Sequence, residues 1–410
     1  MISRYRVLFT VQGFGRLLVS SVLGRMPSGM FSLAILLFVR AQTGSFLAAG
    51  LAVGAFTLTG AVMSPVQGAL VDRLGQPRVL LPCAAGQGLL LVAFVVIVRA
   101  GVPVAAIVAL ASVAGALLPP VSGCVRALWS EVARDPEVLE TAYALDAITQ
   151  EVVYTLGPLL AGSVAVLASP AAAVLLCAAI TVCGTGFFAT SELSRRWRGG
   201  LHERARGGAL SSAGLRTLLY SAVCAGVVVG AAEVGLPALA AQLGARGITG
   251  VLLALFSLGS MTGGLLYSAR SWRAPIASRY ARILLAVEVL LAPLVLAHSL
   301  PAALVCSAVA GLGVAPMLSC QFSLVGALAP AGTTTEAFAW HRGATVAGIA
   351  LGSALGGSLV ERVGVSSSFA LGCSGAALAC LLAAFGRGRM EPAREPGGAQ
   401  PEQEPLTAVA

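Results

Sequence analysis

The chain has 410 residues, of which 57% are hydrophobic and only 10% are charged, and its net charge is +9. A soluble domain carries about 25% charged residues, so this chain has too little charge to cover a water-facing surface, and we expect an integral membrane protein. All 26 basic residues are arginine, which excludes chemistry that needs a lysine, such as an ATP-binding Walker A loop or a Schiff base.

Twelve apolar segments are long enough to cross a bilayer, since a spanning helix needs about 20 apolar residues. They show no alternation of apolar and polar residues, which excludes an outer-membrane barrel. We therefore predict an all-α integral membrane protein with twelve transmembrane helices, at roughly 17–39, 46–70, 79–98, 102–127, 142–167, 170–190, 214–240, 248–268, 280–298, 301–327, 337–360 and 366–386.

The longest polar stretch between spans divides the chain into two groups of six. The predicted parts are an N-terminal six-helix bundle (1–190), a cytoplasmic central linker (191–213), a C-terminal six-helix bundle (214–386) and a disordered cytoplasmic tail (387–410). The linker contains SRRWRGG and HERARGG, which would either bind anionic lipid headgroups or form a solvated connection. The tail is rich in proline, glutamate and glutamine and cannot build a core.

The distribution of arginine predicts the orientation. With the N-terminus inside, only Arg40, Arg99, Arg246 and Arg362 fall in outside loops, and the positive-inside rule then places both termini in the cytoplasm. We interpret the net positive charge as a sign of this orientation, and we expect no binding of nucleic acid.

The segment GALVDRLGQPR, between the second and third spans, resembles motif A of the major facilitator superfamily. The family pattern is a glycine, three residues, Asp, a basic residue, one residue, a glycine and further basic residues; it is matched by Gly68, Asp72, Arg73, Gly75 and Arg78. Together with the twelve spans, the resemblance covers residues 1–386. It implies the family's fold, two pseudo-symmetric six-helix bundles around a central substrate site.

These residue types suit a contact between the bundles. Glycine permits a tight turn and a close approach of helices, and an Asp carboxylate is stabilised at a helix N-terminus. In this fold span 11 begins on the same face, near Thr333, Thr334 and Thr335. We therefore expect Asp72 to latch the halves together when the cavity opens outward; the alternative is a charged hairpin held inside by its arginines. The second half has Ser268 where Asp72 would stand.

Ionisable groups inside spans face protein or a water-filled cavity. Arg25, Arg126, Asp146, Glu151 and Glu233 are therefore candidates for proton and substrate coupling. Glu151 is the preferred proton carrier, because burial favours the neutral form of a carboxyl group, and Glu233 is the second choice. The alternative for Glu151 is a permanent ion pair, for example with Arg126. Asp146 would belong to a cytoplasmic gate or be an exposed charge at a helix end, and His341 shares both readings.

The fifth span contains YTLGPLLAG, which resembles a shortened form of the family's antiporter motif. Pro158 can kink the helix, and Gly157 and Gly162 are expected to let span 11 pack closely. Two residues of the region where the full motif has glycines are Gln150 and Glu151. The resemblance favours export, although a plain packing seam would account for the same glycines.

Spans 5 and 11 resemble each other at a constant offset of 195 residues, seen where Ala142 meets Ala337 and Gly157 meets Gly352. Repeated halves imply a substrate site between them, reached alternately from each side.

We thus predict a transporter of a bacterial-type inner membrane, resembling drug and metabolite efflux members of the family, that exports small amphipathic organic molecules in exchange for protons. Met26, Met30, Phe31 and Met317 offer an apolar lining. The alternatives are an uptake permease or facilitator of the same fold and a non-transporting membrane sensor. We expect a monomer in the lipid bilayer, with no enzymatic activity, cofactor or metal.

Overall fold

The computed structural model describes residues 14–133, 135–197, 207–245, 248–270, 272 and 274–391, and these residues form helices and no strand. The first bundle contains α2 (Phe14–Thr43), α3 (Phe46–Leu74), α4 (Gln76–Arg99), α5 (Val104–Ala116), α6 (Val121–Val132), α7 (Pro136–Leu167) and α8 (Pro170–Ala189). The second contains α10 (Ala213–Gln242), α11 (Thr249–Ala269), α12 (Ile276–Leu291), α13 (Leu300–Gly311), α14 (Val314–Leu328), α15 (Thr334–Arg362) and α16 (Val365–Phe385).

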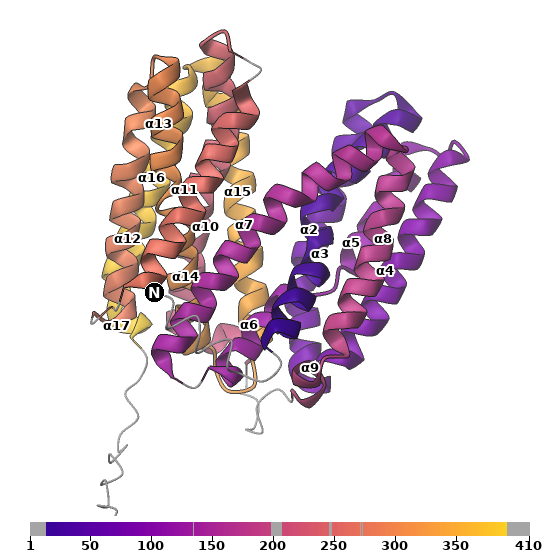
Figure 1. Ribbon diagram of the computed structural model, residues 1–410, viewed down its shortest axis with the longest axis horizontal. Coiled ribbons are helices and arrows are strands. Elements are labelled where there is room, and N and C mark those ends of the chain that lie inside the picture. The colour runs from indigo at the N-terminus through magenta and orange to yellow at the C-terminus, as the bar shows by residue number, and fades with distance from the viewer. Residues whose placement is uncertain are drawn as a thin grey trace, which may run out of the picture.

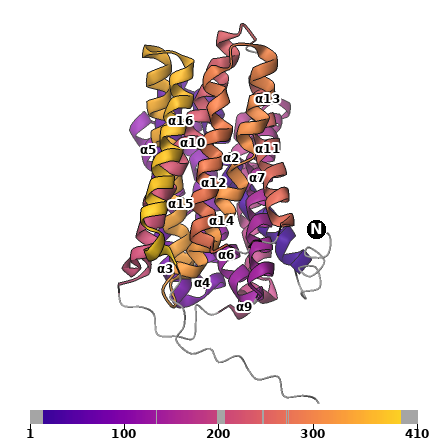
Figure 2. The same cartoon turned by 90° about the vertical axis from the view of Figure 1, so that its left-hand side faces the viewer.

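The two bundles stand side by side and diverge from one end (Figure 1). We name this the closed end; α2, α7 and α15 begin there, and the opposite end is the open end. Helix α7 leans across the boundary between the bundles (Figure 1). The bundles meet where α3 packs against α15 and α7 packs against α11 and α14. Figure 2, turned by 90°, looks onto the second bundle.

Eleven helical segments among the described residues are long and apolar enough to cross a membrane. The twelfth member of the layout is α12, whose 16 residues continue as a 3-10 turn, Ala292–Leu296. The all-α layout of twelve spans in two bundles is therefore as predicted.

Two predicted spans are broken within their length. The span expected at 102–127 is divided between α5 and α6, because Pro119 and Pro120 lack a backbone N–H and disfavour helical geometry in the residue before them. The span expected at 301–327 is divided between α13 and α14 at Leu312 and Gly313. Length and hydropathy find such spans but do not show the break.

The predicted linker is more buried than a solvated connection would be. Its first part forms α9 (Glu192–Arg196), and Trp197 after it is buried. Ser194 in α9 donates to Gln76 Oε1 at 2.8 Å, which ties the linker to the start of α4. Residues 198–206, with most of the predicted arginine cluster, lie outside the described residues.

The start of the predicted disordered tail is ordered. Arg387–Met390 form the short helix α17, and Met390 is buried. The helix packs against α10, where the backbone of Arg389 comes close to Gly214. The prediction of disorder for 392–410 falls on residues outside the described part of the chain.

Glycine seams hold the first and fifth helices of each bundle together. A Cβ on Gly157 of α7 would lie 2.7 Å from the backbone of Gly29 in α2, and a Cβ on Gly352 of α15 would lie 2.5 Å from the backbone oxygen of Val227 in α10. The expectation that the span 5 glycines pack against span 11 is therefore wrong, since each seam lies within its own half.

The rest of the span 5 motif lies along the same side of the first bundle. A Cβ on Gly162 would meet Leu33 of α2 at an ordinary 3.5 Å, and Pro158 lies inside the continuous helix α7. In the repeat, Gly157 and Gly352 occupy equivalent positions because the same helix pair is packed twice.

Replacing Gly348 by alanine is expected to destabilise the protein by about 1–3 kcal/mol, because overpacking forces backbones apart. The new Cβ would lie 2.0 Å from the backbone oxygen of Val223 in α10. Thermal unfolding in detergent should show a lower midpoint. The control is Gly54→Ala in α3, where a Cβ meets nothing within 4 Å; it should leave the midpoint unchanged or raise it, since alanine favours helix by roughly 0.5–1 kcal/mol. Equal midpoints for Gly348→Ala and the wild type would contradict this account of the seam.

Candidate functional site

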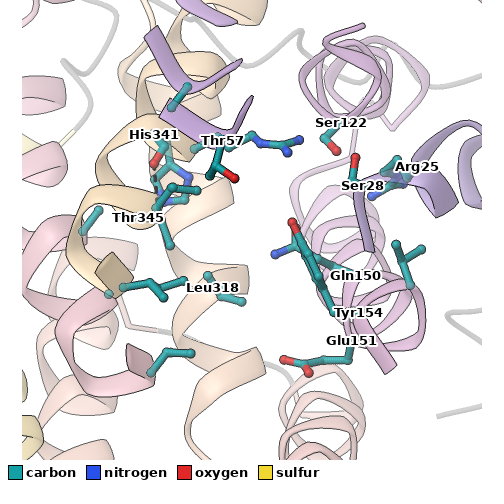
Figure 3. A pocket seen from close by; sticks show the side chains of 18 of the residues that line it. Arg25, Ser28, Thr57, Ser122, Gln150, Glu151, Tyr154, Leu318, His341 and Thr345 are labelled. Atoms are coloured by element: carbon teal, nitrogen blue, oxygen red, sulfur yellow. Dashed lines mark hydrogen bonds between the residues drawn. The ribbon is translucent and has the colours of Figure 1, made fainter. Parts of the chain in front are cut away.

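A cavity of about 380 Å³ lies between the two bundles. Figure 3 shows Arg25, Gln150, Glu151 and Tyr154 of the first bundle facing Leu318, His341 and Thr345 of the second across this space. Four of the five charged residues singled out from the sequence line the cavity; they are Arg25, Arg126, Glu151 and Glu233. The structure thus brings together side chains from α2, α6, α7 and α10.

A buried charge cluster joins α2, α6 and α7. The carboxylate of Asp146 accepts from Arg25 Nη2 at 2.7 Å and from Arg126 Nε at 2.8 Å. Trp129 Nε1 contacts the same carboxylate at 3.4 Å. All three charged residues are at most 3% exposed. The reading of Asp146 as an exposed charge at a helix end is therefore wrong; a buried carboxylate needs such partners, and only the fold brings the two arginines to it.

Arg126 also connects the cluster to the second bundle. Its guanidinium group lies over the ring of Phe322 in α14, 3.7 Å from the ring centre, and Nη2 donates to Gln150 Oε1. A cation over an aromatic face is attracted by the ring quadrupole. The alternative of an Arg126–Glu151 ion pair is therefore wrong in this conformation, because Asp146, Gln150 and Phe322 occupy the guanidinium group.

Glu151 lies apart from the arginines. It is five residues beyond Asp146, about 7.5 Å closer to the open end along α7, and it is half-buried. Ser260 of α11 donates to Glu151 Oε1 at 3.0 Å, so this hydrogen bond crosses from one bundle to the other. Glu233 lines the cavity from α10, and its side chain is exposed.

A chain of hydrogen bonds runs from the cavity into the second bundle, and its direction follows from its last acceptor. Ser221 donates to the carbonyl oxygen of Ala379, so it accepts from Tyr280, which in turn accepts from Gln321 Nε2. The other atom of that amide, Oε1, then accepts from His341 Nε2 at 2.9 Å. His341 is thus a buried ring whose Nε2 donates to an amide oxygen, not an exposed helix-end group.

The closed end contains the contact expected from motif A. Asp72 Oδ1 accepts from the backbone N–H of Thr335 at 3.1 Å, and Oδ2 accepts from that of Glu336 at 2.9 Å. These are unpaired N–H groups of the first turn of α15, where the helix dipole favours an anion. Thr333 stands at the N-cap position, but its side chain donates to Pro330, so Asp72 supplies the cap from the other bundle.

The motif A glycines have separate geometric roles. A Cβ on Gly68 would lie 2.9 Å from the Cα of Glu336, so only glycine lets α3 approach α15 this closely. Gly75 has φ +88°, the left-handed region that glycine favours, and it ends α3 before α4 begins. Arg73 and Arg78 are exposed at this end.

A second contact between the bundles at the closed end is an ion pair, and it is not evident from the sequence. Glu140, near the start of α7, binds both terminal nitrogens of Arg279 in α12; one of these bonds measures 3.0 Å. Arg279 is buried beside the rings of Tyr267 and Trp272. Sequence spacing gives no sign of this pair, because α7 and α12 meet only in the folded protein.

Comparison with known proteins agrees with the fold. The family model described as Major Facilitator Superfamily matches residues 17–287 and 218–409. Among curated proteins, none matches this chain in sequence.

Several solved structures are similar in shape. The crystal structure of the human organic anion transporter MFSD10 (TETRAN) is 17% identical, with a TM-score of 0.71, covering 90% of this chain and 98% of that one. A bacterial homologue of the iron transporter ferroportin, outward-facing with soaked iron, is 18% identical with a TM-score of 0.72, covering 90% and 98%. Another structure of a bacterial ferroportin homologue, also outward-facing, is 16% identical with a TM-score of 0.74. The match covers 91% of this chain and 99% of that one.

Proposed function

Because the chain belongs to the major facilitator superfamily of membrane transporters, we propose that it exports small amphipathic organic molecules in exchange for protons. The observation that carries this proposal is the cavity between the halves, with the carboxyl group of Glu151 in its wall and no cation bound to that group among the described residues. A carboxyl group without a fixed counter-ion can bind and release a proton at little cost.

The lining supports an amphipathic substrate. Apolar side chains such as Phe31, Phe56, Leu318 and Ile349 make up much of the wall, interrupted by a few polar groups. Ligand sites of this kind bind organic molecules through apolar area and fix their orientation through a small number of polar contacts.

The proposed cycle alternates between two states. With both termini in the cytoplasm, as the arginine distribution favours, the closed end is cytoplasmic and the cavity faces outward. In this state Glu151 takes a proton from outside while Asp72 and Glu140 hold the cytoplasmic side shut. Rocking of the bundles separates Glu151 from Ser260 and carries the proton to the other side, where substrate enters.

Replacing Glu151 by glutamine is expected to abolish proton-driven export, because the amide cannot exchange a proton. The measurement is accumulation of a panel of neutral and charged amphipathic compounds in cells that express the wild type or the variant. Wild-type cells should accumulate less than cells without the protein, and both the variant and collapse of the proton gradient should remove this difference.

The matched control is Glu361→Gln, an exposed carboxyl group at the end of α15, which should export like the wild type. Export that survives Glu151→Gln but is lost in Glu233→Gln would move the carrier to α10. Higher accumulation in wild-type cells would reverse the direction and make the protein an uptake system.

A further inference from the structure

A cationic side chain in the cavity wall has no partner among the residues that the structure describes. Arg342 of α15 lines the cavity and is half-buried, and it makes no hydrogen bond or ion pair with any residue that the structure describes. Buried charges in membrane proteins are paired with one another or with backbone carbonyls, because an isolated charge is costly there. An unpaired guanidinium group in a cavity is therefore a suitable binding group for an anion.

The two neighbouring arginines, Arg25 and Arg126, also have fewer carboxylate partners than positive charges. Arg25 and Arg126 share the single carboxylate of Asp146, and Arg342 is close enough to Arg126 to interact with it electrostatically. Arg25 is 3% exposed, and its Nη1 atom has no hydrogen-bond partner among the described residues. Three guanidinium groups thus stand against one carboxylate in this part of the site.

The remaining acids of the cavity do not compensate this charge. Glu151 is bound to Ser260, and Glu233 contacts no arginine among the described residues. The cavity is therefore polarised, with a surplus of positive charge on the arginine side and the carboxyl groups elsewhere. Apolar side chains, among them Phe31 and Leu318, line the same space.

We propose that the transported molecule is an amphipathic organic anion whose acidic group pairs with Arg342 beside the Arg25–Asp146–Arg126 cluster, while its apolar part lies against the aromatic and aliphatic wall. This proposal rests on the transport function above and names its substrate class. A guanidinium group forms two parallel hydrogen bonds with a carboxylate, which gives orientation as well as affinity.

The test uses three probes with one ring system and different charge, namely 2-naphthoate, 2-naphthamide and 2-naphthylmethylammonium. Binding to the purified full-length protein in lipid nanodiscs is measured by equilibrium titration. The carboxylate should bind at least about tenfold more tightly than the amide, the size expected of a hydrogen bond to a charged group, and the ammonium should bind most weakly.

In Arg342→Gln the affinity for the carboxylate should fall to that for the amide, while the affinity for the amide stays the same. Arg342→Lys should keep part of the preference, because it keeps the charge without the planar fork. The control is Arg362→Gln, an exposed arginine at the other end of the same helix, which should bind all three probes like the wild type.

Equal affinities for the three probes, or no binding of any of them up to their solubility limits, would overturn the proposal. An equal loss of carboxylate and amide binding in Arg342→Gln would also overturn it. Export is scored separately in cells. Binding of naphthoate through Arg342 without its export would support the anion site and contradict the proposed export. Glu151-dependent export of neutral or cationic compounds without naphthoate binding would support the proposed export and contradict the anion site.

Discussion

Replacing Asp146 by asparagine is expected to destabilise the protein by about 3–5 kcal/mol, the cost of removing one partner from a buried ion pair. Two guanidinium groups, on Arg25 and Arg126, would stay buried without the carboxylate that they share. Arg126 would keep Gln150 and the ring of Phe322, but neither carries a compensating charge. Thermal unfolding in detergent and the yield of folded protein should both show the loss.

The double variant Arg25→Gln with Asp146→Asn tests whether the loss of stability comes from unpaired buried charge. It removes one cation together with the anion, so it should be less destabilised than Asp146→Asn alone. Glu192→Gln is the control, because Glu192 and its partner Arg196 are exposed and surface pairs contribute only about 0–1 kcal/mol. A melting point for Asp146→Asn equal to that of the control would show that the cluster is not held by the carboxylate.

Replacing Asp72 by asparagine is expected to open the closed end. The carboxylate binds two N–H groups at the start of α15, and hydrogen bonds to a charged group are worth about 1.5–3 kcal/mol. Since each 1.4 kcal/mol is a factor of about ten in an equilibrium constant, the ratio of closed to open molecules should fall at least about tenfold. Amide hydrogen exchange of residues 335–340 should become correspondingly faster, and the proposed export should slow because the closed arrangement is no longer held.

Controls for this experiment come from the same end of the molecule. Arg73→Gln changes an exposed motif A residue that makes no hydrogen bond or ion pair with α15 in the described structure, and it should leave exchange at α15 unchanged. Gly68→Ala should resemble Asp72→Asn, because its Cβ would push α3 away from Glu336. Unchanged exchange at the start of α15 in Asp72→Asn would mean that other closed-end contacts, such as Glu140–Arg279, hold the bundles together without Asp72.

The two closed-end contacts differ in how well the sequence predicts them. Asp72 lies in a local motif whose glycines and spacing are visible in eleven residues, and its partner is the start of another span, which hydropathy also finds. Glu140 and Arg279 belong to no local pattern. They are brought together by the meeting of α7 and α12 across the bundles, which no short stretch of sequence encodes.

For the span 5 motif, the sequence predicted a close helix contact but named the wrong partner helix. Its glycines do mark a close helix contact, as the sequence indicates, but the partner of Gly157 is Gly29 of α2 and not span 11. Small residues identify a seam because they lack a Cβ; they do not identify the helix on the other side. The repeat in turn relates two equivalent seams, and it does not mean that the glycines of span 5 pack against those of span 11.

The sequence by itself determined the membrane class, the number of spans, the two-bundle layout and motif A, because hydropathy, arginine distribution and glycine spacing act over short stretches of chain. Only the tertiary structure decided which charges are paired. It placed Asp146 between Arg25 and Arg126, gave Glu151 a hydroxyl partner on the other bundle, and left Arg342 without a partner in the described part of the cavity. The physical reason is that the interaction of two charges depends on their separation and burial in space, and residues on different helices acquire these only when the helices pack.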